Sequence, residues 1–183
     1  MHFSSECGHV RIVEELLNNG AEVTRNDQGM TPLLCAAERT KADVVEFLLC
    51  RPEFSKEERI EALELLGASF ANDKDSYNLD LSFSYLHRAM KVNMFFDYFL
   101  FLSCYTSSFL QSRFEDPENI LMKPTSVPIE AYEYWIETKT ISELESIQND
   151  SNAVHMESLV IRERILGVNN PEVTNQIVYR FSF

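Results

Sequence analysis

The sequence predicts an all-α protein built from paired helices. Three observations lead to this fold class. A helix pair recurs near the N-terminus with an offset of 32 residues. Capping boxes that begin at Ser55 and Thr140 are typical of helix starts, and Gly167 followed by Pro171 is typical of one helix that ends before another begins.

The internal repeat aligns residues 2–17 with residues 34–49. It places Ser4 and Ser5 on Ala36 and Ala37, and it superimposes the paired apolar residues that follow in each copy. Small residues in one helix and paired apolar residues in the next let two helices pack closely and bury their outer faces against a neighbouring copy. The repeat therefore predicts a stack of helix pairs.

The second copy opens with a helix start, because Thr31 can cap a helix and Pro32 stands at the first helical position. The run TPLLCAA at residues 31–37 and the run GHVRIVEELLNNGA at residues 8–21 resemble the signatures of the ankyrin repeat. We therefore predict inner helices near residues 1–7 and 32–39, and outer helices near residues 10–18 and 42–50.

In this alignment Met1 corresponds to Leu33, so we expect the chain to start inside the first helix of a repeat. An offset of 32 in place of the usual ankyrin period of about 33 implies one residue fewer in the 22–28 connection. A stacked array normally needs about three repeats to bury a continuous core. Other helices are therefore expected to cover the remaining faces.

The middle of the chain predicts two more helices. Ser55 and Glu58 form a capping box, and a helix of about four turns should follow, with apolar or small residues on one face at Ile60, Leu63, Leu66, Gly67 and Phe70. A second helical pattern runs over residues 79–91.

The C-terminal part predicts a loop and then further helices. Prolines between residues 116 and 128 break any helix, and Thr140 with Glu143 forms another capping box. Residues 151–166 are helical in pattern and Gly167 closes them, after which residues 170–172 begin another helix. This arrangement resembles the tetratricopeptide-type helical hairpin.

Four further blocks resemble the feminization (Fem) family, at residues 59–73, 116–120, 143–147 and 162–167. Together with the ankyrin signatures, the resemblance covers about residues 1–91 and 112–180. It implies a substrate receptor of cullin-type ubiquitin ligases, in which a long ankyrin array captures a C-terminal degron and a more C-terminal motif docks to the elongin–cullin machinery. It also implies that the degron pocket lies in repeats absent from this chain, so no degron-binding residue is assigned.

These patterns divide the chain into four parts. Residues 1–54 hold the last two ankyrin repeats, the first of them truncated, and residues 55–91 form a helical linker region. Residues 92–111 form an apolar insert, and residues 112–183 hold the start of a tetratricopeptide-like helical region that is expected to be incomplete.

The 92–111 insert has no counterpart in the Fem pattern. Its apolar run, residues 94–110, is interrupted by Asp97 and is shorter than the roughly 20 apolar residues that a membrane span requires. Removing the insert joins Lys91 to Ser112 and restores the uninterrupted sequence pattern of the Fem family at this point. Because every Val codon begins with GT and Gln can be encoded by CAG, we interpret Val92–Gln111 as an intron read in frame, with a lineage-specific loop as the alternative. Sequencing of the native transcript separates the two.

Composition restricts the function classes. The net charge is −13, and the acidic excess is spread along the chain, whereas a nucleic-acid partner needs a basic stripe. No phosphate-binding glycine loop and no C-x-x-C pair is present, and no secretory signal is evident. We therefore expect protein partners, neither nucleic acid nor membrane, no cofactor, and a cytoplasmic or nuclear location. The oligomeric state cannot be deduced from the sequence.

The His, Cys and Glu residues that could bind a metal or catalyse a reaction are better explained by structural roles. His2, Cys7 and His9 fall at ordinary ankyrin positions, His87 and His155 stand alone in helical stretches, and Cys35 is expected to be a small core residue. Glu130, Glu133 and Glu137 alternate with aromatic residues, and we interpret them as a solvated face beside buried aromatics, with a basic-peptide surface as the alternative. The carboxylate pairs Glu57/Glu58 and Glu143/Glu145 have no companion that would separate their pKa values.

The sequence thus predicts no catalytic residue and no metal ligand. The leading hypothesis is a non-catalytic protein-binding adaptor, a fragment of a substrate-recognition subunit of a cullin-RING ubiquitin ligase. The alternative is a stand-alone ankyrin scaffold that binds a basic protein partner without any ligase role.

Overall fold

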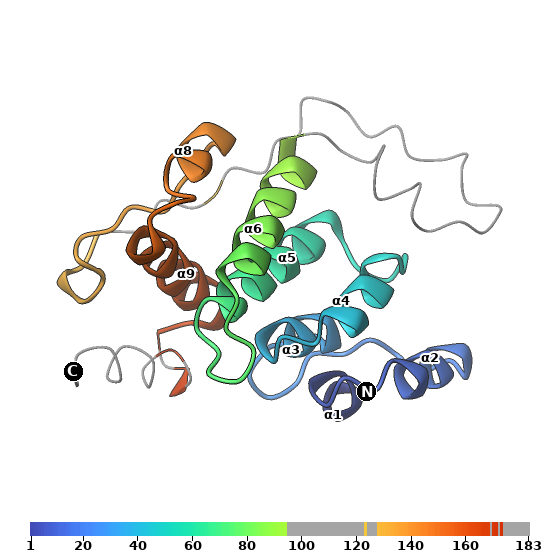
Figure 1. Cartoon of the computed structure of the whole chain (residues 1–183). Helices are drawn as coiled ribbons and strands as arrows, with labels where there is room; N and C mark the ends of the chain where they lie inside the picture. The colour runs from blue at the N-terminus through green and yellow to red at the C-terminus, as the bar shows by residue number, and fades with distance from the viewer. Residues whose placement is uncertain (95–122, 124–127, 169, 172, 174–183) are drawn as a thin grey trace.

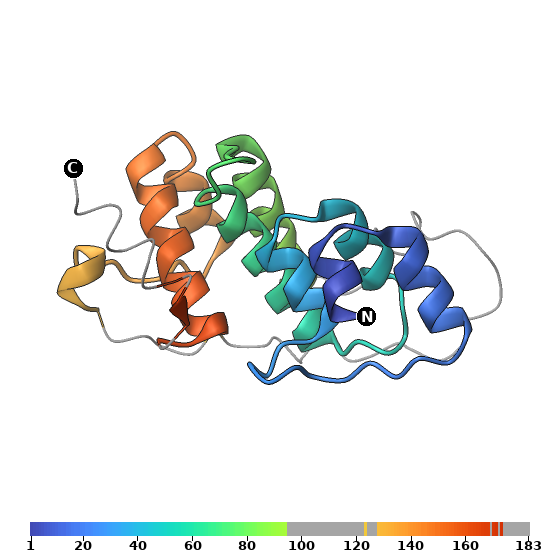
Figure 2. The same ribbon diagram turned by 90° about the horizontal axis from the view of Figure 1, so that it is seen from below.

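The computed structural model describes residues 1–94, 123, 128–168, 170, 171 and 173. All regular secondary structure in these residues is helical, which confirms the all-α fold class. The helices of residues 1–94 form successive pairs arranged in a row. α1 (His2–Glu6) and α2 (Val10–Asn18) lie at one end of the molecule, and α8 (Ile141–Ser146) and α9 (Ser151–Leu166) lie toward the other (Figures 1 and 2).

The N-terminal half of this row consists of two short helix pairs. The first pair is α1 (His2–Glu6) and α2 (Val10–Asn18), and the second is α3 (Pro32–Glu38) and α4 (Ala42–Leu49). The Thr31 hydroxyl accepts a 3.3 Å hydrogen bond from the Leu34 backbone N–H and so caps α3. These bounds confirm the four helix positions that the repeat predicts.

The connection between the two pairs is held by polar side chains. The Asn26 side-chain oxygen accepts hydrogen bonds from the backbone N–H groups of Gln28 (3.0 Å) and Met30 (2.9 Å). The Nε2 atom of His2 lies 3.0 Å from the Thr24 carbonyl oxygen and 3.1 Å from that of Met30. His2 therefore ties α1 to the connecting segment.

Helix α5 (Lys56–Phe70) begins at the predicted capping box, in which Ser55 accepts from the Glu58 N–H and the Glu58 side chain accepts from the Ser55 N–H. The five residues predicted on one face of this helix are buried, and burial extends beyond that face, because every residue from 62 to 70 is buried. α5 lies at the centre of the described helices and contacts α3, α4, α6 and α9 (Figure 1).

Helix α6 (Leu79–Met94) runs along α5, and Gly67 sets how closely the two approach. A Cβ atom at Gly67 would lie 2.9 Å from both Leu86 Cγ and the Ser82 carbonyl oxygen, closer than real Cβ contacts. The two backbones can therefore pack at this distance only because residue 67 has no side chain.

The C-terminal described part contains η1 (Glu130–Tyr132), α8 (Ile141–Ser146) and α9 (Ser151–Leu166). The predicted capping box of Thr140 and Glu143 is present, and α9 ends at Gly167 with φ +86°. Pro171 and Val173 are helical, but the rest of the helix predicted after Gly167 lies outside the described residues. The tetratricopeptide-like pairing therefore remains a prediction.

Two other sequence-based predictions fall mostly outside the described residues. Val92–Met94 form the end of α6, whereas residues 95–111 of the predicted insert are not described, nor is the predicted break at Asp116 and Pro117. The proposed part boundaries after residues 54, 91 and 111 likewise remain predictions.

Candidate functional site

The exposed end of the repeat stack is the first surface of functional interest. Phe3 on α1 is 76% exposed and Ile12 on α2 is 50% exposed, while their counterparts one repeat later, Cys35 and Val44, are 1% and 0% exposed. Equivalent residues are therefore buried where another helix pair packs on them and exposed where none does. This end of the stack presents the type of apolar face that ankyrin helix pairs bury against a neighbour.

A buried ion-pair network is the second feature, and it joins α5, α9 and the segment before α8. Arg164 Nη2 lies 2.7 Å from Glu64 Oε2 and 2.8 Å from Glu137 Oε1, and its Nε donates to Glu137 Oε2 at 2.9 Å. Lys123 Nζ lies 3.1 Å from Glu64 and 3.0 Å from Glu137. Two carboxylates thus share two cations in a site that is almost closed to solvent.

The network shifts the pKa values of Glu137 and Lys123 toward their charged forms. Burial by itself would raise the pKa of Glu137, but the hydrogen bonds of Arg164 and the charge of Lys123 outweigh burial and hold this pKa below its ordinary value. Burial would lower the pKa of Lys123, and the charges of Glu64 and Glu137 raise it instead. The charged forms of Glu137 and Lys123 are therefore stabilised by their partners.

Glu157 on α9 lies beside this network and binds the segment before α8 through hydrogen bonds. Its carboxylate accepts hydrogen bonds from Trp135 Nε1 (2.8 Å), the Thr138 N–H (3.1 Å) and the Thr138 hydroxyl (2.6 Å). Burial raises the pKa of this carboxyl, while the three donors oppose that rise. Glu157 therefore anchors residues 135–138 to α9.

The structure corrects the sequence-based view of the acidic cluster. Glu130 and Glu133 are exposed as predicted, but Glu137 is only 3% exposed and is paired with Arg164 and Lys123. The aromatic residues also divide, because Tyr132 is buried whereas Tyr134 is 63% exposed. The prediction of a uniformly solvated acidic face over buried aromatics is therefore wrong at Glu137 and at Tyr134.

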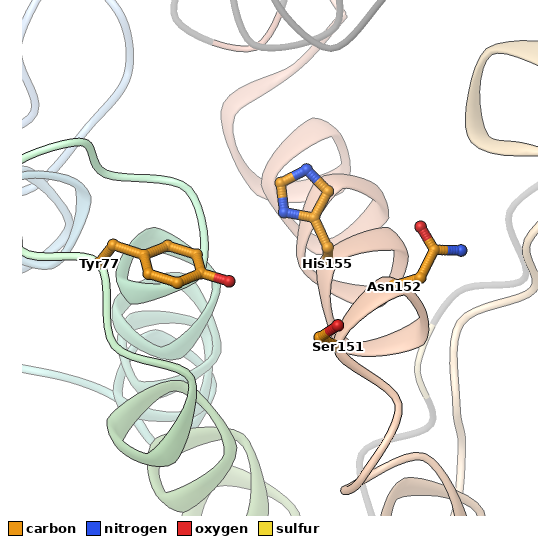
Figure 3. Close-up of a pocket in the computed structure, with 4 residues that line it drawn as sticks. All are labelled: Tyr77, Ser151, Asn152 and His155. Carbon is orange, nitrogen blue, oxygen red and sulfur yellow. The ribbon is translucent and has the colours of Figure 1, made fainter.

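A small open hollow of about 250 Å³ lies between the α5–α6 connection and the start of α9. It is lined by Tyr77, Ser151, Asn152 and His155, and the Tyr77 ring faces the first turns of α9 (Figure 3). His155 Nδ1 lies 3.3 Å from the Ala71 carbonyl oxygen, so this ring is already held by the fold. The hollow offers polar and aromatic contacts without a carboxylate or a cysteine in its lining.

The other candidate residues are accounted for by packing and capping. Cys35 is 1% exposed, and burial together with nearby Glu6 and Glu38 raises the pKa of its thiol from 9.0 to about 12, which disfavours the nucleophilic thiolate. His87 Nε2 lies 3.4 Å from Glu145 Oε1, on another helix. Glu58 accepts from Arg25 at 2.8 Å in addition to its capping role.

Among the residues that the structure describes, no group of three His, Cys, Asp or Glu side chains is placed to hold a metal ion. Within the same part of the chain, none of the helices is both long and apolar enough to cross a bilayer.

Sequence reasoning missed the network of Glu64, Lys123, Glu137 and Arg164. Its ion pairs join residues 14 to 100 positions apart, so no local spacing marks them. The one local signal is Glu64 itself, a charged residue inside the apolar run of α5.

Comparison with known proteins gives two findings. Residues 1–60 match the family model described as ankyrin repeats in three copies. The chain is 35% identical over 170 residues to human protein fem-1 homolog C, 37% identical over 157 residues to the Xenopus laevis protein of the same name, and 35% identical over 161 residues to fem-1 homolog A of Danio rerio. These matches cover 92%, 85% and 87% of this chain and 24%, 22% and 23% of the relatives.

The comparisons agree with the structure. The matched ankyrin region contains the two stacked helix pairs and reaches into α5, and the match to the fem-1 homologs extends across most of the chain. The chain spans about a quarter of the length of these relatives. The chain is therefore similar to the fem-1 homologs over most of its length, and its ankyrin repeats indicate a protein-binding protein.

Proposed function

We propose that the chain acts as a non-catalytic adaptor within a substrate-recognition subunit of a cullin-RING ubiquitin ligase, in the cytoplasm or nucleus. The observation that carries the proposal is the similarity to fem-1 homologs, which covers 92% of the chain. Ankyrin stacks bind other proteins through extended surfaces. The described surface, with its exposed stacking face and open hollow, suits binding better than a reaction that requires an enclosed site.

The role of this segment in the adaptor is to hold two parts of the molecule in a fixed relation. α5 contacts both the ankyrin helix α3 and the later helix α9, and the network of Glu64, Glu137 and Arg164 fastens the segment before α8 to the same place. A substrate receptor needs such rigidity, because substrate and ligase machinery bind different parts of one chain. Under the adaptor hypothesis, the buried network keeps the ankyrin helices and the later helices in a fixed arrangement.

The alternative is a stand-alone ankyrin scaffold that binds a basic protein. The net charge of −13 favours it, since an acidic surface attracts basic partners and speeds their association.

Co-purification separates the two functions. The complete gene product that carries this sequence is tagged, expressed and isolated at physiological salt, and its partners are tested for elongin and cullin subunits. Recovery of both in stoichiometric amounts supports the ligase adaptor. Recovery of basic proteins without either subunit supports the scaffold and overturns the ligase role. A variant with Arg164→Met, which disrupts the buried network, is isolated in the same way and tests whether partner binding requires this network.

A further inference from the structure

The segment from Ile129 to Ile136, here called the 129–136 turn, exposes a group of large apolar side chains. Ile129, Tyr134 and Ile136 are 40%, 63% and 60% exposed. The turn includes η1 and projects from the helical body in both views (Figures 1 and 2). Three of the eight large apolar residues that are exposed in the described part of the chain thus lie within eight positions of one another.

Some apolar side chains of this segment are buried and others remain in water. Its inward side chains include Tyr132, packed with Met156, Leu159 and Val160, and it is followed by the buried polar residues Glu137 and Thr138. The apolar Tyr134 and Ile136 point instead to solvent. Burying the two polar residues and exposing the two apolar ones is unfavourable for the isolated chain, because apolar surface remains in water.

The turn is held in this conformation by its own hydrogen bonds and by α9. The Tyr134 N–H donates to the Ile129 carbonyl at 3.0 Å, and the Trp135 N–H donates to the Tyr132 carbonyl at 2.8 Å. Glu133 and Tyr134 have φ values of +53° and +57°, a left-handed conformation that residues other than glycine rarely adopt in succession. The Trp135 indole N–H bonded to Glu157 fixes the end of the turn. The apolar side chains are therefore displayed by a preformed structure, which lowers the entropic cost of binding.

Charge identifies the kind of partner. Glu130 and Glu133 are exposed in the same turn, and residues 128–138 contain no Lys, Arg or His. We propose that the 129–136 turn is a docking surface for a segment of another protein in which apolar residues are flanked by Lys or Arg. The apolar residues of the partner cover Ile129, Tyr134 and Ile136, and its cations pair with the two carboxylates. This surface is separate from the ankyrin stack, and the proposal holds whether or not the chain serves a ligase.

The test uses the full chain and a fluorescein-labelled peptide of ten residues in which three leucines are separated by lysines. A second peptide has glutamate in place of each lysine. Fluorescence anisotropy measures both affinities for the native chain, for Tyr134→Ser/Ile136→Ser and for Glu130→Lys/Glu133→Lys. Leu81→Ser is the matched control, because Leu81 is 41% exposed on α6 and lies outside both the turn and the hollow. Thermal unfolding checks that each variant remains folded, as expected for exposed positions.

We expect the lysine peptide to bind the native chain and Leu81→Ser equally, and to bind the Tyr134→Ser/Ile136→Ser variant at least about tenfold more weakly. The Glu130→Lys/Glu133→Lys variant should reverse the preference in favour of the glutamate peptide. Equal binding of both peptides to the native chain overturns the proposal, as does equal binding by native and serine variants. A native dimer that the serine substitutions dissociate, observed by sedimentation, would assign the turn to a second copy of this chain and also overturn it.

Discussion

Arg164 joins parts of the chain that are far apart in sequence, since it lies 100 positions from its partner Glu64. It sits on α9 and bonds to Glu64 on α5 and to Glu137 before α8. Its side chain is 14% exposed and both carboxylates are 3% exposed, so the three charges have few water molecules to replace a lost partner. The net worth of a buried ion pair can be small, but the loss of one partner is costly because the other charge stays buried.

Substitution Arg164→Met should therefore lower the free energy of unfolding by about 3 kcal/mol, since Glu64 and Glu137 would keep only Lys123 as a cationic partner. Urea denaturation followed by circular dichroism measures the change. Arg88→Met is the control, because the side chains of Arg88 and Glu46 are 32% and 41% exposed, and this more accessible pair should contribute at most about 1 kcal/mol. Equal losses of unfolding free energy in the two variants would show that burial does not increase the contribution of the Arg164 network to stability.

Glu137 should make stability depend on acid. Its folded pKa is held below the ordinary value of 4.5, so the folded state favours the charged form. The stabilisation is complete above pH 4.5 and is lost as the pH falls through the lower folded pKa. The variant Glu137→Gln should be less stable near pH 7 and should lose less stability between about pH 5 and pH 3. Exposed Glu130→Gln is the control and should follow the native curve. The free energy of unfolding is measured by urea denaturation at each pH. If it falls in parallel for the native chain and for Glu137→Gln, Glu137 is not the source of the acid dependence.

At the scale of the elements, the sequence predicts helix positions well and helix environments less well. Thr31, Ser55 and Thr140 cap helices where expected, because capping depends on residues three positions apart. The all-round burial of α5 depends on α9, nearly a hundred residues later, which no pattern within α5 can reveal. The prediction that Glu137 is solvated is wrong for the same reason. Its neighbours in sequence are aromatic, whereas its ionic partners are distant in sequence.

Gly67 provides the test of packing between α5 and α6. Alanine is the better helix former by about 1 kcal/mol, yet Gly67→Ala should destabilise the chain, because its Cβ would lie 2.9 Å from the Ser82 carbonyl oxygen and 2.9 Å from Leu86 Cγ. We expect a loss of about 1–3 kcal/mol in the free energy of unfolding, typical of an overpacked core. Gly67→Val should cost more than Gly67→Ala in the same urea experiment. A more stable Gly67→Ala variant would show that α6 can move away from α5 without loss.

At the scale of the whole molecule, the helix pairs form a row in which each inner helix is buried by the next. α1 contacts α3, α3 contacts α5, and α5 contacts α9, so the core runs through the described structure from α1 to α9. In this chain, the outer face of α1 and α2 leaves the apolar side chains of Phe3 and Ile12 in water. Repeat stacks normally require a polar outer face at the end of the row for solubility, and this end does not provide one.

The exposed end should therefore drive self-association of the isolated chain. Phe3 and Ile12 occupy positions whose counterparts in the next repeat are fully covered, so a second molecule can bury them in a similar way. We expect sedimentation velocity to show dimers or larger species at micromolar concentrations, and the variant Phe3→Gln/Ile12→Lys to shift the chain toward the monomer. The substitution Leu81→Gln serves as the control, because Leu81 is 41% exposed on α6, away from this end, and should leave the association unchanged. Circular dichroism should show the same helix content in all three proteins. A native chain that remains monomeric at these concentrations, or a dimer that survives the double substitution, would show that this apolar face does not govern association.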